Sequence, residues 1–211
     1  MTKSETISQL LAEKIVVVIR GTSQKEALQA ARACIEGGIK VIEVAYTNPQ
    51  ASQIIECLTK VYASQEIIIG AGTVLDPQTA RTAILAGAKF IVSPAFSSQT
   101  AKLCHGNLIP YLPGCMTPTE VTRALEHGCD LLKIFPAASL GPSHISSLKA
   151  ALPHLQLMVT GGVNLYNAKD WFKAGASLIG IGGEFNKLAS QGNYDAITEM
   201  AQKYHKLIFN D

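Results

Sequence analysis

Short apolar runs recur along the whole chain at intervals that suit a repeating strand and helix unit. There are eight runs, and in most of them apolar residues occupy both alternate positions. This pattern is typical of strands in a parallel sheet, which are covered by helices on both faces. In chain order the runs are KIVVVIR, IKVIEVAY, EIIIGAG, KFIVSPA, LIPYLPG, DLLKIFPA, LQLMVTGG and SLIGIGG.

The segments between the runs carry residues that begin and end helices. Thr117, Pro118 and Glu120 fit a capping box with proline at the first helical position. Asp76 before Pro77 fits a second helix start. A glycine that can close a helix in the left-handed conformation precedes four of the apolar runs, at Gly37, Gly87, Gly128 and Gly175.

The repeated units predict a single (β/α)8 barrel domain that spans residues 1–211. No break in composition interrupts the series, and segment 3–13 predicts an additional N-terminal helix that covers the bottom of the barrel. An open Rossmann-type sheet is the alternative. It is weakened because the first turn, VVVIRGTS, lacks the GxGxxG pattern of a dinucleotide site.

Charge and hydropathy narrow the class of partner. The net charge is +2 and charged residues make up 16% of the chain, so no strong field favours nucleic acid or an acidic membrane. We therefore expect a small-molecule substrate. No apolar run approaches the length of about 18 residues that spans a bilayer, and the N-terminus lacks an export signal, so we expect a cytoplasmic protein.

The metal-ligating residue types show no metal-binding spacing. The five cysteines never form CxxC, and the five histidines form neither HxH nor HExxH. We expect reduced thiols that pack as small core residues, no bound metal and no cofactor.

Three ionisable residues lie near the carboxyl ends of predicted strands, where barrel enzymes place their active sites. They are Arg20, Glu43 and Lys133. Side chains alternate across a strand, so each shares a face with apolar residues of its run and is able to project into the barrel mouth.

Lys133 lies within the apolar run DLLKIFPA, and Glu43 lies within IKVIEVAY. A buried lysine must pair with a carboxylate or lose its proton more readily, and the second outcome makes it a nucleophilic amine. A buried carboxyl holds its proton to higher pH, which suits proton transfer near neutrality. The alternative for both residues is a structural Glu43 to Lys133 ion pair.

Glycine pairs follow the last two runs. Gly161 and Gly162 end the seventh, while Gly182 and Gly183 end the eighth. Loops at these positions of a barrel commonly bind phosphate through backbone N–H groups, although glycine also serves ordinary tight turns. Asn164 or Asn167 is a candidate cap for the helix that follows the first pair.

Taken together, the motifs resemble the family of 2-keto-3-deoxy-6-phosphogluconate (KDPG) and 4-hydroxy-2-oxoglutarate (KHG) aldolases. The resemblance runs in order from about residue 15 to 185, and the pairing of VIEV with KIFPA is its most specific part. The motifs that carry it are VVVIR, GGIKVIEVAYTNP, IIIGAGTVLDP, FIVSPAF, IPYLPGCMTPTE, LLKIFPA, VTGGV and IGIGG.

The resemblance implies a role for several residues. Lys133 is implied as the Schiff-base lysine and Glu43 as the general acid and base. Thr73 is implied to help hold the carboxylate of the keto acid, while Pro94 and Phe135 are implied as pocket walls. The family further implies a homotrimer and a place in carbohydrate metabolism of the Entner–Doudoroff type.

Two positions depart from the family pattern. Some relatives carry an arginine shortly after the catalytic glutamate, whereas this chain has Thr47 there, so we expect Arg20 to bind the substrate carboxylate instead. Alternatively, Arg20 forms a surface ion pair. Glu184 stands where relatives known for phosphate binding have a serine, and unless it points away it penalises a phosphorylated substrate.

The leading hypothesis is therefore a Schiff-base aldolase that cleaves KDPG to pyruvate and glyceraldehyde 3-phosphate, and that also acts on KHG. Glu184 leaves open a preference for an unphosphorylated aldehyde. A phosphosugar isomerase or epimerase without covalent catalysis is the second hypothesis. The third is a non-catalytic ligand-binding barrel.

Overall fold

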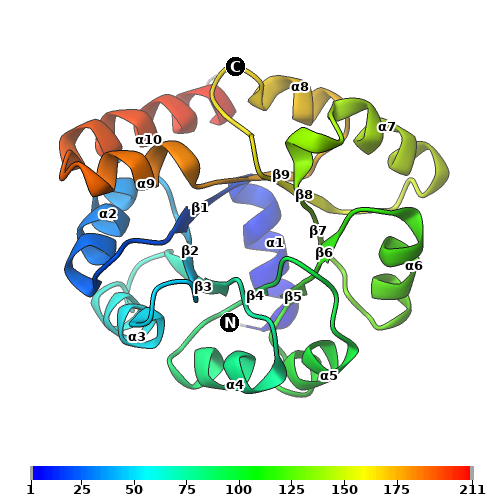
Figure 1. Ribbon diagram of the computed structural model, residues 1–211, viewed down its shortest axis with the longest axis horizontal. Coiled ribbons are helices and arrows are strands. Elements are labelled where there is room, and N and C mark those ends of the chain that lie inside the picture. Colours follow the sequence, from blue (N-terminus) through cyan, green and yellow to red (C-terminus); the bar gives the residue numbers. More distant parts are fainter. Residues whose placement is uncertain (1, 210–211) are drawn as a thin grey trace.

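The apolar runs form a ring of parallel strands surrounded by helices (Figure 1). The computed structural model describes residues 2–209, and within them the strand order is β5-β4-β3-β2-β1-β9-β8-β7-β6. The strands are β1 Ile15–Ile19, β2 Val41–Ala45, β3 Ile68–Gly72, β4 Ile91–Val92, β5 Tyr111–Leu112, β6 Gly114–Cys115, β7 Leu132–Ile134, β8 Leu157–Thr160 and β9 Leu178–Ile181.

The fifth apolar run is divided into β5 and β6 by Pro113. Proline has no N–H to donate to a strand ladder, so the run cannot continue as one strand through this residue. The ring therefore closes through the chain itself at Pro113. The predicted (β/α)8 barrel is confirmed, and the open-sheet alternative is wrong, because the first strand pairs with the last and the two ends of the strand order, β5 and β6, are joined through Pro113 alone.

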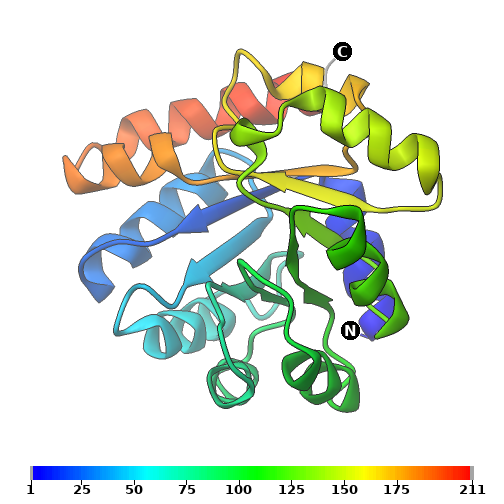
Figure 2. The same cartoon turned by 45° about the vertical axis from the view of Figure 1, so that its right-hand side comes forward.

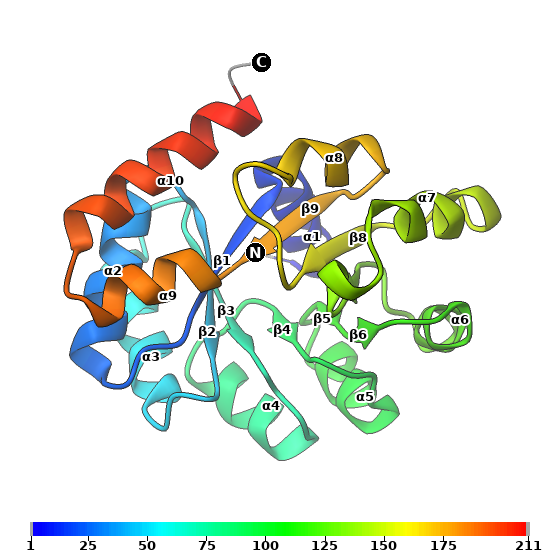
Figure 3. The ribbon, with the colours of Figure 1, turned by 45° about the horizontal axis from the view of Figure 1, so that its top comes forward.

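Helices cover the outside of the strands (Figure 2). Figure 3 shows α9 and α10 beside α2, where the last helices pack against the first crossover. The helices are α1 Lys3–Glu13, α2 Gln24–Glu36, α3 Ala51–Val61, α4 Pro77–Leu85, α5 Ser98–Gly106, α6 Pro118–Glu126, α7 Pro142–Ala151, α8 Ala168–Lys173, α9 Gly183–Ser190 and α10 Tyr194–Phe209.

The helix signals are mostly confirmed. Thr117 and Glu120 form the predicted capping box, and the Asp76 side chain accepts a hydrogen bond from the N–H of Thr79. The prediction for Gly37 is wrong, because its φ is −79° and the left-handed residue is Gly38. Gly37 serves packing instead, since a Cβ there would lie 2.4 Å from that of Ala201 on α10.

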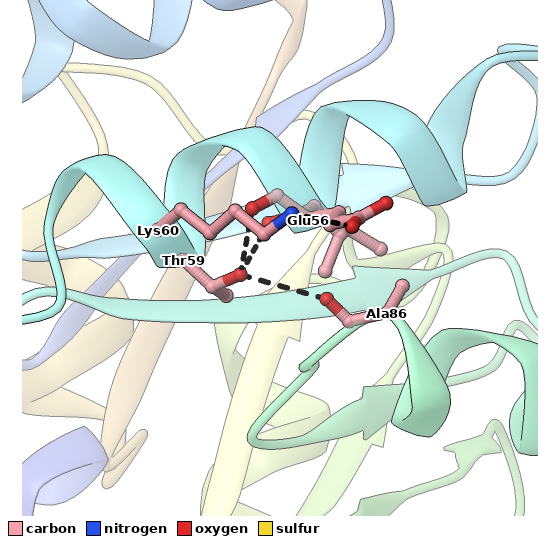
Figure 4. Close-up of polar contacts among 5 residues, drawn as sticks. Glu56, Thr59, Lys60 and Ala86 are labelled. Carbon is pink, nitrogen blue, oxygen red and sulfur yellow. Dashed lines mark hydrogen bonds and ion pairs between the residues drawn. The ribbon is translucent and has the colours of Figure 1, made fainter.

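Thr59 links α3 to the end of α4 (Figure 4). Its hydroxyl lies 2.9 Å from the carbonyl oxygen of Ile55 and 3.5 Å from that of Ala86, the residue that caps α4. Beside it, Lys60 and Glu56 form an exposed ion pair one turn apart on α3. Such exposed pairs are screened by water and contribute little to stability, so burial of the apolar helix face accounts for most of the packing.

The barrel interior is filled from below by apolar side chains. Leu10 of α1 is fully buried and packs into this inner layer, which confirms the predicted N-terminal helix at the barrel bottom. The layer consists of Leu10, Val16, Val41, Ile68, Phe90, Val92, Leu112, Leu131, Met158 and Leu178. A larger apolar layer separates the strands from the outer helices. Among residues 2–209, no helix has the length and apolar character needed to cross a membrane.

Candidate functional site

A cavity of about 650 Å³ opens at the carboxyl ends of the strands. The inner apolar layer forms its floor, because Val41 and Leu131 lie two residues before Glu43 and Lys133 on the same strand faces. Apart from Glu43, every site residue predicted from the sequence lines the cavity. These residues are Arg20, Thr73, Pro94, Lys133, Phe135, Gly161, Gly162, Gly182, Gly183 and Glu184.

Lys133 lies at the centre of β7 and reaches the cavity from its inner wall. Only 5% of the residue is exposed. Its Nζ lies 4.9 Å from the centre of the Phe135 ring, which suits an attraction between a cation and an aromatic face. The amine is therefore surrounded by protein on most sides and open to a small ligand on one.

Glu43 lies on β2, just behind the cavity wall, and is only 1% exposed. A Cβ on Gly72 would stand 1.8 Å from Glu43 Oε1, so only glycine leaves room for the carboxyl group. Burial raises the pKa of Glu43, while the nearby charges of Lys133 and Arg20 oppose that rise. Its Oε2 has no hydrogen-bond partner, so the group is available to a water molecule or a ligand.

The structural ion pair considered from the sequence is not formed. Within the described residues, no hydrogen bond or ion pair joins Glu43 to Lys133. The two groups interact through space inside a poorly solvated interior. An arrangement with two unpaired ionisable groups costs stability, which is more typical of a functional site than of a structural one.

Thr73 follows Gly72 and holds a strained backbone conformation. Its φ is +56°, in the left-handed region that a β-branched residue rarely adopts. Such strain costs about 1–3 kcal/mol and persists where the surrounding structure imposes it. Here it turns the chain out of β3 directly after Gly72, and Thr73 lines the cavity.

Arg20 follows β1 and lines the cavity from an exposed position. Its guanidinium group has neither a hydrogen bond nor an ion pair within the described part of the chain, so the surface ion pair considered from the sequence is not formed. Thr47 is exposed and does not line the cavity. Arg20 therefore offers an uncommitted cation at the mouth, and Thr47 offers none.

The two glycine pairs come together at one end of the cavity. Gly161 and Gly162 have φ values of +93° and +84°, and a Cβ on Gly162 would lie 2.3 Å from that of Ala138. Gly183 begins α9, whose first intrahelical acceptor is the carbonyl of Gly182. The N–H groups of the first turn of α9 therefore have no partner in the helix, an arrangement that favours anions.

Asn167 takes the N-cap position of α8, but its side chain does not cap the helix. Its amide donates to the carbonyl of Gly162 and accepts from the N–H of Asn164. The Asn164 side chain accepts from the N–H groups of Tyr166 and Asn167, and its carbonyl accepts from the N–H of Ala168. The predicted cap is therefore wrong for Asn167, whereas Asn164 caps the turn that leads into α8.

Glu184 lines the same end of the cavity and is anchored from outside it. The Tyr204 hydroxyl, on α10, donates a 2.8 Å hydrogen bond to Glu184 Oε2. Burial, followed by the effect of Glu184, raises the pKa of Tyr204, so the phenol keeps the proton that it donates. A fixed carboxylate therefore stands at the start of α9.

Sequence reasoning missed Thr160 and Lys187, which also line the cavity. Thr160 is 8% exposed, and its hydroxyl is buried without a partner. A signal for it was present, since Thr160 lies two residues after the inward-facing Met158 at the end of β8. Lys187 lies one turn after Glu184 on α9. The sequence pattern does not show which side of this helix faces the cavity, so Lys187 could not be predicted.

No group of three or more metal-ligating side chains is arranged to hold an ion in the part of the chain that the structure describes. All five cysteines are free. Burial raises the pKa of Cys104, Cys115 and Cys129 to about 12, so these thiols remain protonated and unreactive.

The chain resembles known proteins over most of its length. The model of the family described as KDPG and KHG aldolase matches residues 6–200. The chain is 35% identical over 171 residues to 2-dehydro-3-deoxy-6-phosphogalactonate aldolase of Escherichia coli K12, covering 81% of this chain and 83% of the relative. It is 31% identical over 205 residues to KHG/KDPG aldolase of the same organism, covering 95% of each chain.

A solved structure is similar as well. It is KDPG aldolase from Legionella pneumophila with pyruvate captured at low pH as a covalent carbinolamine intermediate. It matches with a TM-score of 0.85 at 28% identity, over 92% of this chain and 95% of that one.

The burial of Glu43 makes a prediction about stability and pH. The pKa of Glu43 in the folded protein lies above the ordinary 4.5. Its contribution to the free energy of unfolding is therefore fully present below pH 4.5 and is lost as the pH rises toward the raised pKa. Glu43→Gln removes this loss. We expect the variant to gain on the wild type by about 1.4 kcal/mol per pH unit across that window.

Urea unfolding of both proteins at several pH values measures this difference. Glu126→Gln, which changes an exposed carboxyl on α6, is the control and should show no such trend. Parallel stability profiles for wild type and Glu43→Gln would contradict the assignment of a desolvated carboxyl.

Proposed function

This chain belongs to the KDPG and KHG aldolase family and is an aldehyde-lyase, and we propose that Lys133 forms a Schiff base with a 2-keto-4-hydroxy acid and releases pyruvate. The observation that supports this most is the position of Lys133. A nearly buried amine on an apolar strand lines the cavity at the carboxyl ends of the strands. Such an amine has no structural ion pair to explain its burial.

The first part of the proposed reaction takes place at Lys133. Its neutral Nζ attacks the C2 carbonyl of the keto acid, and loss of water from the carbinolamine gives a protonated imine. The imine withdraws electrons from the C3–C4 bond. When the bond breaks, its electron pair moves into the imine and forms an enamine. The protonated imine on Lys133 is therefore the electron sink.

Glu43 is proposed to move the proton. Its carboxylate accepts the proton of the C4 hydroxyl as the aldehyde leaves, and then returns a proton to C3 of the enamine. Hydrolysis of the resulting imine releases pyruvate and regenerates Lys133. Because Glu43 lies behind the cavity wall with an unpartnered Oε2, the transfer is proposed to run through one water molecule.

The remaining lining residues are proposed to hold the two ends of the substrate. Arg20 and Thr73 bind the carboxylate, since an arginine can give it two parallel hydrogen bonds. Pro94 and Phe135 form the walls beside Lys133. The unpartnered Thr160 hydroxyl is available to a substrate oxygen near Lys133, because β7 and β8 are neighbours.

The distal end of the substrate is proposed to bind at Gly161, Gly162, Gly182 and Gly183. Free N–H groups there favour a phosphate, so we propose KDPG, cleaved to pyruvate and glyceraldehyde 3-phosphate, as the leading substrate. KHG, cleaved to pyruvate and glyoxylate, is proposed as the second. Glu184 opposes the phosphate, because a charge pair about 4 Å apart costs roughly 1 kcal/mol in water and about 4 at an effective dielectric constant of 20.

Trapping with pyruvate and borohydride tests the Schiff base. Reduction should label Lys133 alone, as located by peptide mass mapping, and Lys133→Ala should abolish both labelling and cleavage. Lys102→Ala, which removes an exposed lysine on α5, is the control and should leave both intact. Cleavage without an adduct would contradict the Schiff base and favour proton transfer by Glu43 alone. Isomerisation of a phosphosugar without an adduct would instead support the isomerase or epimerase.

Glu184→Ser tests the distal end. Removing the carboxylate should raise kcat/KM for KDPG by roughly tenfold or more, and leave kcat/KM for KHG nearly unchanged. Steady-state kinetics on both substrates measure the change, with Glu126→Ser as the control on an exposed face of α6. An equal change for both substrates would show that Glu184 does not act on the phosphate.

We also propose that the protein is a cytoplasmic homotrimer that serves sugar-acid degradation of the Entner–Doudoroff type. The support is that the chain belongs to the family. The resemblance of its motifs to that family implies a trimer. Light scattering coupled to size-exclusion chromatography should give a mass three times the 22.5 kDa of one chain. A mass of one or two chains at micromolar concentration would contradict the trimer.

A further inference from the structure

Asn186 on α9 bonds to the backbone of two separate strand ends. Its Oδ1 accepts a 2.8 Å hydrogen bond from the N–H of Arg20. Its Nδ2 donates to the carbonyl oxygens of Val18 at 2.7 Å and Gly182 at 2.6 Å. One side chain therefore joins the end of β1 to the end of β9, which are separated by more than 160 residues in sequence.

These bonds reproduce the pattern of a parallel strand. In a parallel ladder, one residue donates its N–H to the carbonyl before a partner residue and accepts the N–H after it. The Asn186 amide does both around Ile19, since it reaches the carbonyl of Val18 and the N–H of Arg20. The main-chain ladder between β1 and β9 pairs Val17 with Ile181. Asn186 therefore adds a further rung after β9 has turned into α9.

This rung matters because the Arg20 side chain has no bonding partner of its own among residues 2–209, so its direction depends on how its backbone is held. Its guanidinium group has no partner in the described residues, and the residue is exposed. The backbone is held on its other side by Asn48, a residue 1% exposed, whose Nδ2 donates to the carbonyls of Arg20 at 2.9 Å and Gly21 at 3.2 Å. Two asparagine amides thus fix the peptide groups on both sides of Arg20.

The direction of the Arg20 side chain follows from this bonding. Val16 faces the inner apolar layer and Val18 lines the cavity, so an extended backbone places Arg20 on the same face. Gly21 then leaves the strand with a φ of +66°. Without the rung at Ile19, the chain would be free to turn one residue earlier and carry Arg20 away from the mouth.

We propose that Asn186 is a positioning residue that holds Arg20 toward the carboxylate of the keto acid and so sets the affinity of the site for it. The inference rests on the proposed function, in which Arg20 binds that carboxylate. Asn186 does not line the cavity, so it acts on the carboxylate through Arg20, and its bond to Gly182 concerns only the distal group of a longer substrate. It therefore affects binding and leaves the covalent step at Lys133 unchanged.

Pyruvate alone is the appropriate probe, because it carries the carboxylate and the ketone but has no distal group to contact Gly182. The experiment measures borohydride inactivation of the enzyme against pyruvate concentration. In Asn186→Ala the half-saturating concentration of pyruvate should rise about tenfold, as expected for a weakened hydrogen bond to a charged group. The inactivation rate at saturating pyruvate should stay within about twofold of the wild type.

A double variant separates positioning from a general structural effect. Arg20→Ala should raise the half-saturating concentration at least as much, and adding Asn186→Ala to it should cause no further rise. Asn107→Ala is the matched control, since Asn107 ends α5, accepts from Arg81 and donates to Leu103 away from the cavity. It should leave the pyruvate dependence unchanged.

Three results would overturn the positioning role. The first is an unchanged pyruvate dependence in a folded Asn186→Ala variant, and the second is a full additional rise in the Arg20→Ala background. If Asn186→Ala does not fold, Asn48→Ala makes the same test from the carbonyl side of Arg20, and an unchanged dependence there is the third. Absence of any trapping in the wild type would overturn the proposed function, and this role with it, whereas normal wild-type trapping limits a failure to Asn186.

Discussion

The cost of burying two ionisable side chains in an apolar barrel governs the rest of this site. Glu43 and Lys133 stand above a layer made only of apolar side chains, at 1% and 5% exposure. Neither is relieved by a direct ion pair with the other. Burial therefore raises the pKa of Glu43. The two groups lower the stability of the folded protein, but they remain free to react with a ligand that enters the cavity.

The surrounding backbone makes room for these groups by omitting side chains and by accepting strain. Gly72 lets the Glu43 carboxyl occupy the space of a missing Cβ, and the chain then leaves β3 at Thr73 in a left-handed conformation. Arg20 and the start of α9 follow neighbouring strands, β1 and β9, and the Asn186 amide bonds to both Arg20 and Gly182. Glu184, fixed by Tyr204, lines the cavity together with the first turn of α9. The cavity wall thus combines a free cation, a fixed carboxylate and free N–H groups.

Local sequence patterns were sufficient for the elements and for most of the cavity lining. Apolar runs gave the strands, and alternation along them placed Lys133 and Arg20 on the inner face. The break at Pro113 follows from a residue that the run itself contains, whereas the packing role of Gly37 depends on Ala201 of α10, a neighbour that only the folded chain supplies. Asn186 could not be found in this way, because its partners Val18 and Arg20 lie more than 160 residues away and no local pattern marks a side chain that completes a strand ladder.

Infrared difference spectroscopy of the carboxyl groups reports whether Glu43 keeps its proton in the folded protein. Spectra of the wild type and of Glu43→Gln are recorded as the pH is varied. Their difference isolates the C=O stretch of one protonated carboxylic acid. If desolvation dominates, that band persists well above pH 4.5, the ordinary value for glutamic acid, and disappears in the variant. A band that vanishes at or below pH 4.5 would show that Glu43 is solvated or paired, and would contradict the account.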